Sequence, residues 1–406
     1  MTRFLPLAAL ALLCPAMAGA QTEPVGTRLS VDPAALPAPY ATDSASNSPR
    51  EVARPAGVLP AVPPGFAVQL FAEGFEHARW LAVAPDGAVF LAQPQAGTVT
   101  RLIDADGDGI AEGRSDFVTG LNLPHGLALH DGQLYIGDAY GVWRVAYDGG
   151  ERAAAPVRIT DDGAFGDPGG HWTRNIAFSR DGADLFVAIG SQGNIAEEAL
   201  PRATIQRFAA GGGAGHSFAT GLRNPVGLAV HPQTGALWTV VNERDGLGDE
   251  LVPDYLAQVI EGAFYGWPYA YLGRPDPRLG GRRPELAAAM RRGEVLFRSH
   301  SAPLGLVFYD GGQFPADFKG DAFVALHGSW NAGRPRGYQV VRVKFDHGRP
   351  AADAYEVFAS GFWQAGRDRA SVWGRPCGLA VARDGALLVA DDVANVIWRI
   401  SYRGSL

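Results

Sequence analysis

Cysteine is nearly absent from this sequence of 406 residues, which has only Cys14 and Cys377. Cys14 lies in a segment that we expect to be removed on export. Cys377 would then be the only thiol of the mature chain, so an intrachain disulfide is excluded. A Cys-x-x-Cys-His motif for covalent haem is also absent. Stability is therefore expected to come from core burial and bound groups rather than from covalent cross-links.

Long apolar runs are equally scarce. The only such run is in the first 20 residues, where Arg3 precedes a short apolar stretch and a small-residue site ends at Ala20. This pattern predicts a signal peptide at residues 1–20, because the run is too short to span a bilayer. We expect a periplasmic or secreted protein with no membrane span, cleaved near Ala20.

The chain also lacks a basic excess. It has 35 Lys and Arg against 42 Asp and Glu, a formal net charge of −7. Long-range attraction to phosphate needs a basic surface, so nucleic acid is an improbable partner. Helical periodicity is rare as well, and the stretch from Glu285 to Arg292 is the most helical in character.

Six related segments are the main positive feature. Each has a small apolar strand start, a turn containing Gly, and a second short strand. They begin at Trp80, Gly126, Asn175, Gly227, Gly305 and Gly378, and so lie 46, 49, 52, 78 and 73 residues apart. Hairpins with a period of about 45–50 residues are typical of β-propellers. The repeat predicts an all-β fold, a six-bladed β-propeller of four-stranded antiparallel blades, over residues 65–406. Residues 21–64 are rich in Pro and Ala and predict a linker or an extended arm.

Basic side chains precede every repeat. If each repeat opens the innermost strand of a blade, these groups meet on one face around the central channel. They are Arg79, His125, His171 with Arg174, Arg223, His300 and Arg375. A ring of guanidinium and imidazole groups is suited to a polyanionic ligand.

Motifs in unbroken order between residues 64 and 402 resemble the soluble sugar dehydrogenases that depend on pyrroloquinoline quinone (PQQ), in particular their sorbosone dehydrogenase-like branch. The motifs are Gly-His-Trp-Thr-Arg at 170–174, Gly-Leu-Arg-Asn-Pro at 221–225, Asn-Glu-Arg-Asp-Gly-Leu-Gly-Asp-Glu at 242–250, Gly-Ala-Phe-Tyr-Gly-Trp-Pro at 262–268, His-Gly-Ser-Trp-Asn at 327–331 and Gly-Arg-Pro at 374–376. The resemblance implies PQQ and Ca²⁺ as cofactors. It also implies a sugar substrate and a soluble electron acceptor, either a small cytochrome or a quinone.

The resemblance also assigns roles to residues. His171 would be the general base and Arg223 would stabilise charge on the quinone oxygens, with Asn224 at the same edge. His327 stands where glucose-oxidising relatives have a lysine that binds the cofactor. Arg375 stands at one of their carboxylate-binding arginines.

Cys377 stands at a second arginine position of those relatives. That departure leaves carboxylate recognition open, with Arg79 or Arg336 as possible substitutes, and His125 is a further candidate for the cofactor site. For Ca²⁺, the resemblance implies the backbone carbonyls of Arg244 and Asp245.

A separate acidic segment has Asp104, Asp106 and Asp108 at the spacing of an EF-hand loop. Its twelfth position is Ser115 rather than Glu, so a complete EF-hand is excluded. A surface turn and a weak structural Ca²⁺ site remain open.

Three other functions remain for the whole chain. A propeller hydrolase of the lactonase type would hold axial Ca²⁺ with carboxylates, whereas this chain places basic residues at most repeat entries. A non-catalytic binding propeller needs no particular His or Arg. The third is a relative that has kept the fold but lost its affinity for PQQ, which Cys377 at an expected arginine position leaves open.

Overall fold

The computed structural model describes residues 22–404, so the expected signal peptide lies outside the described residues. The described part is nearly all-β. Its helices are α1 (Pro284–Ala288), which overlaps the first half of the stretch expected to be most helical, and the 3₁₀ turn η1 (Ala316–Phe318). Among residues 22–404, no helix is long and apolar enough to cross a membrane.

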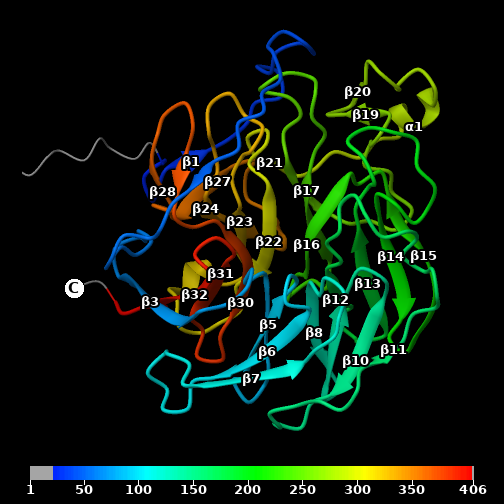
Figure 1. The fold of residues 1–406 in the computed structure, drawn as a ribbon. Coiled ribbons are helices and arrows are strands. Elements are labelled where there is room, and N and C mark those ends of the chain that lie inside the picture. Colours follow the sequence, from blue (N-terminus) through cyan, green and yellow to red (C-terminus); the bar gives the residue numbers. More distant parts are fainter. Residues whose placement is uncertain (1–21, 405–406) are drawn as a thin grey trace, which may run out of the picture.

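Six antiparallel sheets make up most of the molecule (Figure 1). The first comprises β4 (Trp80–Val83), β5 (Val89–Gln93), β6 (Thr98–Ile103) and β7 (Gly113–Val118). The second comprises β8 (Gly126–His130), β9 (Gln133–Gly137), β10 (Val142–Ala146) and β11 (Val157–Arg158). The third comprises β12 (Ile176–Phe178), β13 (Asp184–Ile189), β14 (Thr204–Ala209) and β15 (Gly212–Thr220).

The other three large sheets continue this order along the chain. The fourth comprises β16 (Asn224–Val230), β17 (Leu237–Asn242), β18 (Tyr255–Gln258) and β21 (Val295–Leu296). The fifth comprises β22 (Pro303–Phe308), β23 (Ala322–Leu326), β24 (Gln339–Val343), β27 (Tyr355–Ala359) and the added strand β1 (Arg28–Leu29). The sixth comprises β30 (Pro376–Val381), β31 (Leu387–Asp391), β32 (Val396–Tyr402) and β3 (Phe66–Glu73).

Three small sheets occupy the connections. They comprise β19 (Ala270–Tyr271) with β20 (Arg274–Pro275), β25 (Phe345–Asp346) with β26 (Arg349–Pro350), and β2 (Arg50–Glu51) with β29 (Ser371–Val372) and β28 (Trp363–Ala365). The expected all-β fold with four-stranded antiparallel sheets is confirmed in this coarse form, with a fifth strand added to one sheet.

The first strands of the six large sheets contact one another in a closed cycle, β4 to β8, β12, β16, β22, β30 and back to β4. The repeated glycines explain how these strands approach so closely. A Cβ at Gly126 would lie 2.4 Å from the Arg174 carbonyl oxygen, and one at Gly378 would lie 2.5 Å from the Arg79 carbonyl oxygen. Glycine is thus needed where neighbouring backbones meet. The arrangement is β-propeller-like, and β3 closes it by pairing with β32 near the other end of the chain.

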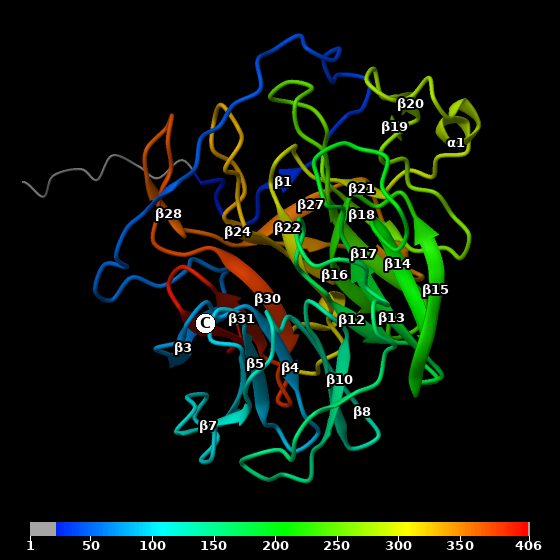
Figure 2. The same ribbon diagram turned by 45° about the vertical axis from the view of Figure 1, so that its right-hand side comes forward.

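Residues 22–64, which we call the arm, run as an extended chain along the fifth and sixth sheets. In both views the first part of the arm, in dark blue, lies at the same end of the molecule as β19, β20 and α1, and the rest runs down the left side towards β3 (Figures 1 and 2). Strand β1 pairs with β27, and β2 pairs in parallel with β29. These pairings supply hydrogen-bond partners to a segment with little apolar sequence of its own.

Candidate active site

Two neighbouring cavities lie at the end of the ring where the first strands begin. The loops before the first strands and after the second strands meet there. The small cavity has a volume of about 130 Å³. Its lining includes His171, Arg223, Asn224, Asp245, Asp254, His300, Trp330 and Asn331. The large cavity has a volume of about 590 Å³, and its lining includes Glu51, His77, Arg79, Trp172, His327, Arg375 and Asp392. Because His171 and Trp172 are consecutive, one short segment contributes to both walls.

His171 is held in one orientation by the loop that follows β13. Its backbone N–H donates to the Ser191 carbonyl oxygen at 3.0 Å, and its Nδ1 lies 2.9 Å from the same oxygen. A proton on Nδ1 satisfies this contact, which leaves the lone pair on Nε2. Burial and the nearby Arg223 lower the pKa of His171 to about 4. The side chain is therefore a neutral imidazole with a free basic nitrogen at neutral pH.

The position beside His171 admits only glycine. A Cβ at Gly190 would lie 2.6 Å from the Cβ of His171 and 2.6 Å from Oδ1 of Asn224. That amide oxygen is buried and has no hydrogen-bond partner among residues 22–404. A buried acceptor without a partner is costly, so Asn224 is poised to receive a donor or a cation.

Arg223 is a buried cation fixed by three segments. It donates from Nε to the Asn194 carbonyl oxygen at 3.1 Å and from Nη1 to the Asn242 carbonyl oxygen at 3.3 Å, while its Nη2 lies 3.4 Å from a carboxylate oxygen of Asp245. Burial lowers the pKa of Arg223 from its ordinary high value, and Asp245 opposes that shift. The guanidinium therefore presents a fixed positive charge beside His171.

Asp245 is one of three acidic residues that line the small cavity, with Glu243 and Asp254. Its carboxylate accepts a hydrogen bond from Asn331 Nδ2 at 2.5 Å and lies 3.2 Å from Nδ1 of His300. Burial alone would raise the pKa of Asp245, but the contacts with His300 and Arg223 hold it below its ordinary value. Nearby, burial raises the pKa of Asp254 to about 7. The cavity thus combines one carboxylate that stays ionised with one that titrates near neutral pH.

The backbone around Asp245 is already engaged. Its carbonyl oxygen accepts 2.9 Å hydrogen bonds from Asn194 Nδ2 and from Nη1 of Arg278. The side chain of Arg244 is fully buried and pairs with Glu243 at 2.8 Å and with Asp276 at 3.3 Å. Arg244 therefore fixes the loop through buried ion pairs.

Asp392 is the centre of the charge network in the large cavity. Its carboxylate is almost fully buried, is bonded to Arg79, and lies 2.8 Å from Nε2 of His327 and 3.3 Å from Nε2 of His77. Burial alone would raise the pKa of Asp392, but His327 and Arg79 hold it well below its ordinary value. Burial and the positive charge of Arg375 lower the pKa of His327 to about 3. Asp392 thus neutralises Arg79 and orients a neutral His327.

Arg375 is the cation of the large cavity with the fewest acidic contacts. Its Nε donates to the His327 carbonyl oxygen at 2.9 Å and its Nη2 donates to the Gly328 carbonyl oxygen at 2.6 Å. Both acceptors are neutral, so they orient the guanidinium without cancelling its charge. Cys377, which stands where glucose-oxidising relatives have a second arginine, does not line the large cavity. Its thiol is buried and contacts the carbonyl oxygens of Ala78 and Ala390.

Two other sequence candidates line neither of these cavities. His125 is fully buried, packs against Trp80 and Trp172 at ring distances of 4.7 and 5.6 Å, and has no hydrogen-bond partner for either ring nitrogen within the described chain. Arg336 pairs with Asp249 at 2.7 Å and with Glu250, away from both cavities. Of the two proposed substitutes for the missing arginine, only Arg79 lines one of these two cavities.

Sequence reasoning missed several wall residues. Trp172 stands in the large cavity with the guanidinium of Arg79 5.5 Å from its ring, and Asp392 lines the same cavity. The signal for Trp172 was its place next to His171. Asp392 follows the last residue of β31, where the topology of the repeat also directs side chains to this end of the ring.

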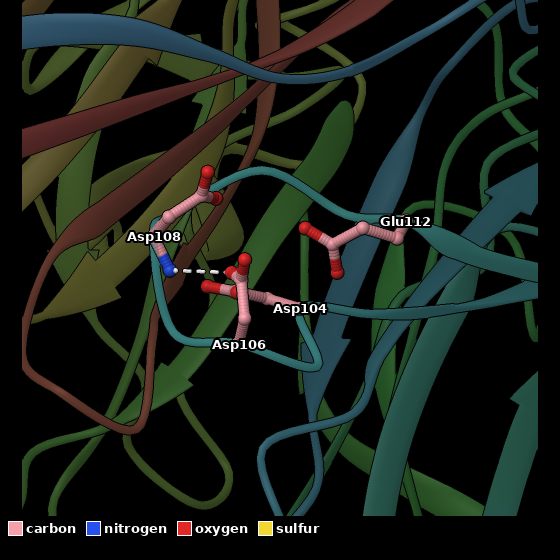
Figure 3. Close-up of side chains that lie close together, drawn as sticks. All are labelled: Asp104, Asp106, Asp108 and Glu112. Carbon is pink, nitrogen blue, oxygen red and sulfur yellow. Dashed lines mark hydrogen bonds between the residues drawn. The ribbon is translucent and has the colours of Figure 1, made fainter.

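The acidic segment forms a compact loop whose residues line neither of the two cavities. The metal-ligating atoms of Asp104, Asp106, Asp108 and Glu112 lie within 4.8 Å of one another (Figure 3). Glu112, rather than Ser115, is the residue that completes the group. The carboxylate of Asp104 accepts hydrogen bonds from the backbone of Gly107 and Gly109, and Glu112 accepts one from Ala105. These bonds account for the shape of the turn.

A closed ring of antiparallel sheets with adjoining polar cavities at one mouth defines the class of protein. The family model described as TrAA12-like matches residues 60–254 and 286–403. The chain therefore belongs to the TrAA12-like family, which agrees with the family-level resemblance drawn from the sequence motifs.

Individual relatives support the same class. An uncharacterised protein of Borreliella burgdorferi is 32% identical over 235 residues, or 57% of this chain, and the chain spans 61% of that relative. The holo PQQ domain of pyranose dehydrogenase from Coprinopsis cinerea is 20% identical with a TM-score of 0.72, over 87% of this chain and 99% of that one. The calcium structure of the family AA12 enzyme from Trichoderma reesei is also 20% identical with a TM-score of 0.72, over 84% and 97%. The two structures share the fold of this chain.

Proposed function

We propose that this chain is an exported quinoprotein that oxidises an aldose or a sorbosone-like sugar with PQQ and Ca²⁺, on a six-bladed propeller. One observation carries the proposal: His171, held through Nδ1 so that Nε2 is free, lines the same small cavity as the buried cation Arg223. A fixed base next to a fixed positive charge is the arrangement that hydroxyl oxidation requires. The names of the structural neighbours add support, since one is a PQQ domain of a pyranose dehydrogenase.

The residues present fit the chemistry of PQQ, a planar quinone with three carboxylates. Arg375 presents a guanidinium whose hydrogen-bonded partners are neutral, and Arg79 has a buried Nε without a partner in the described part of the chain. Asn224 and Arg223 stand at the other end, in the small cavity. Arg79, His327 and Arg375 would hold the carboxylates, while Arg223 and Asn224 would hold the quinone edge. When bound, PQQ supplies a two-electron acceptor.

His171 would take the proton of the sugar hydroxyl on Nε2. Its Nδ1–H stays bonded to the Ser191 carbonyl oxygen, so the ring keeps its orientation while Nε2 gains the proton. Arg223 would stabilise negative charge that develops on the oxygen side of the reacting group, because its own charge is fixed before the reaction. Trp330, which is 49% exposed in the small cavity, would offer a face against which the sugar ring can pack.

Calcium would bind in the small cavity through side-chain oxygens. The Asp245 carboxylate and the unpartnered Oδ1 of Asn224 are oxygen donors of the kind that Ca²⁺ prefers. The Asp245 carbonyl oxygen already accepts a bond from the Arg278 guanidinium. We therefore favour the carboxylate of Asp245 over its backbone carbonyl, and over that of Arg244, as the ligand from this loop.

A lactonase-type hydrolase is the alternative. It would need carboxylates at the channel axis to hold Ca²⁺ and a histidine to activate water. Asp245 and Asp254 supply some of this chemistry, but such a hydrolase does not account for Arg79 and Arg375 in the adjoining large cavity. A binding propeller without catalysis would not require the oriented His171.

In the proposed dehydrogenase, electrons would pass from the reduced cofactor to a separate soluble carrier, a small cytochrome or a quinone.

Titration of the metal-free apoprotein with PQQ, with and without Ca²⁺, followed by dye reduction over a panel of aldoses and sorbosone, tests the proposal. Calcium-dependent uptake followed by sugar-dependent dye reduction is the expected result. Uptake without turnover on any sugar would refute the assigned reaction. Hydrolysis of lactones by the PQQ-free protein would favour the alternative.

A further inference from the structure

The arm lies mostly outside the part of the chain that the family model describes. The TrAA12-like match begins at residue 60, whereas the arm begins at residue 22. An extended segment of this length loses conformational entropy when it is ordered on a surface. Its hydrogen bonds show which parts of the propeller it holds in return.

Asn47 is the arm residue that contacts the loop of Trp330. Its backbone N–H donates to the Trp330 carbonyl oxygen at 2.7 Å. Its Nδ2 donates to the Ala332 carbonyl oxygen at 2.9 Å and to the Asp368 carbonyl oxygen at 2.7 Å. A side-chain amide nitrogen has two hydrogens, so these two bonds use both. Asn47 thus joins the loop to the segment that precedes β29.

The backbone of this loop has no other hydrogen-bonded support in the described part of the chain. Among residues 22–404, the backbone groups of Trp330, Asn331 and Ala332 make hydrogen bonds only with Asn47. A loop with few backbone hydrogen bonds opens locally at a low cost in free energy. The place of residues 330–332 therefore depends on Asn47.

The loop in turn forms part of the small cavity. Trp330 and Asn331 both line it. The Nδ2 of Asn331 donates to the Asp245 carboxylate and lies 3.2 Å from Nδ1 of His300. A shift of the loop would therefore move both the exposed ring of Trp330 and the amide that contacts Asp245.

The arm also holds the loop on the other side of this contact. The Thr42 hydroxyl accepts a hydrogen bond from the Asp249 N–H at 2.9 Å, four residues after Asp245. Residues 42–47 of the arm therefore bridge the two loops that meet where Asn331 contacts Asp245.

We propose that Asn47 is a positioning residue, through which the arm holds Trp330 and Asn331 in place to bind the sugar at the small cavity. The inference rests on the proposed function for the identity of the ligand as a sugar. His171 is held separately, by the Ser191 carbonyl oxygen in the loop after β13. Loss of the Asn47 contacts is therefore expected to weaken sugar binding and to spare the transfer of the hydroxyl proton.

The first test separates KM from kcat. Asn47→Ala removes both side-chain hydrogen bonds, and Asn47→Asp keeps the shape but replaces the donor by a carboxylate that repels carbonyl oxygens. In either variant the loss of two hydrogen bonds should raise KM for an aldose about tenfold, with kcat within about twofold of the wild type. The matched control is Ser46→Ala, which removes an exposed hydroxyl that makes no hydrogen bond within residues 22–404.

Two measurements on the PQQ-free protein need no sugar. The Tm of each variant should lie within about 4 °C of the wild type, because the changes are local. Acrylamide quenching reports on Trp330, whose emission is the difference between proteins with and without Trp330→Phe, since the chain has nine tryptophans. Release of the loop should raise the quenching constant of Trp330 in Asn47→Ala, because the side chain is only 49% exposed in the wild type.

Two results would overturn the inference. One is a quenching constant of Trp330 that Asn47→Ala leaves unchanged, and the other is an unchanged KM in a protein that oxidises sugars. Dye reduction by the wild type loaded with PQQ is measured separately and reports on the proposed function. Increased quenching of Trp330 in a protein that reduces no dye with any sugar would refute the oxidation but leave the positioning role of Asn47 standing.

Discussion

Replacing Gly190 by alanine is expected to disable the site while leaving the fold intact. The new Cβ would lie 2.6 Å from the Cβ of His171 and from Oδ1 of Asn224. Ordinary contacts of a Cβ begin at 3.4 Å, so both distances must lengthen by about 0.8 Å, through movement of the two side chains or of the backbone. The Cβ of His171 is next to its backbone and cannot rotate away, so the shift falls on His171 or on the neighbouring strand β16.

A displacement of about 1 Å at a catalytic group costs about 100-fold in rate, or about 2.7 kcal/mol in the activation free energy. We expect Gly190→Ala to lower kcat by that order in the dye assay, with near-wild-type melting. Gly211→Ala is the matched control, because nothing lies within 4 Å of a Cβ at that position. Wild-type kcat in Gly190→Ala would refute the role given to the contact between His171 and Asn224.

Three further predictions concern single groups. His171→Ala should abolish turnover while PQQ uptake is retained. Because burial and Arg223 lower the pKa of His171 to about 4, the wild-type kcat/KM should rise with pH through about 4 and then level off. A kcat/KM that still rises at pH 7 would contradict this role. Asp392→Asn should lower the free energy of unfolding in urea by about 3–5 kcal/mol, because it leaves Arg79 buried without its partner. The pKa of Asp392 is depressed in the folded state, so its contribution is present above the unfolded pKa of about 3.9 and is lost as the pH falls towards the folded value; equal acid sensitivity of wild type and variant would argue against it. Cys377→Arg should lower Tm and fail to improve PQQ binding, because the thiol is buried between backbone carbonyls; a tighter, stable variant would refute this placement.

Much of the fold followed from the repeat alone. Gly126 and Gly378 mark first strands in the sequence, and the structure shows the reason, since each lies against the backbone of a neighbouring first strand. Topology then placed His171, Arg223 and Arg375 at one end of the ring. The spacing of the repeats was enough to predict where these residues lie, because each one precedes a first strand and the ring holds the first strands in place.

What the sequence could not give were the contacts made by pairs distant in the chain. The bond between Arg79 and Asp392 joins residues more than 300 positions apart, and no local pattern marks it. His125 has the same place in its repeat as Arg79, yet it is packed beneath Trp172 because the neighbouring aromatic rings cover it. Glu51 lies in a segment without periodicity, so only the pairing of β2 with β29 places it in the cavity.

The central claim is most directly tested by isothermal titration of the apoprotein with PQQ in the presence of Ca²⁺, in the wild type and in Arg375→Leu. The account predicts saturable binding of one PQQ per chain, at least tenfold weaker in the variant because a cation that pairs with a carboxylate is lost. Absence of binding at micromolar PQQ, or equal affinity in both proteins, would contradict it.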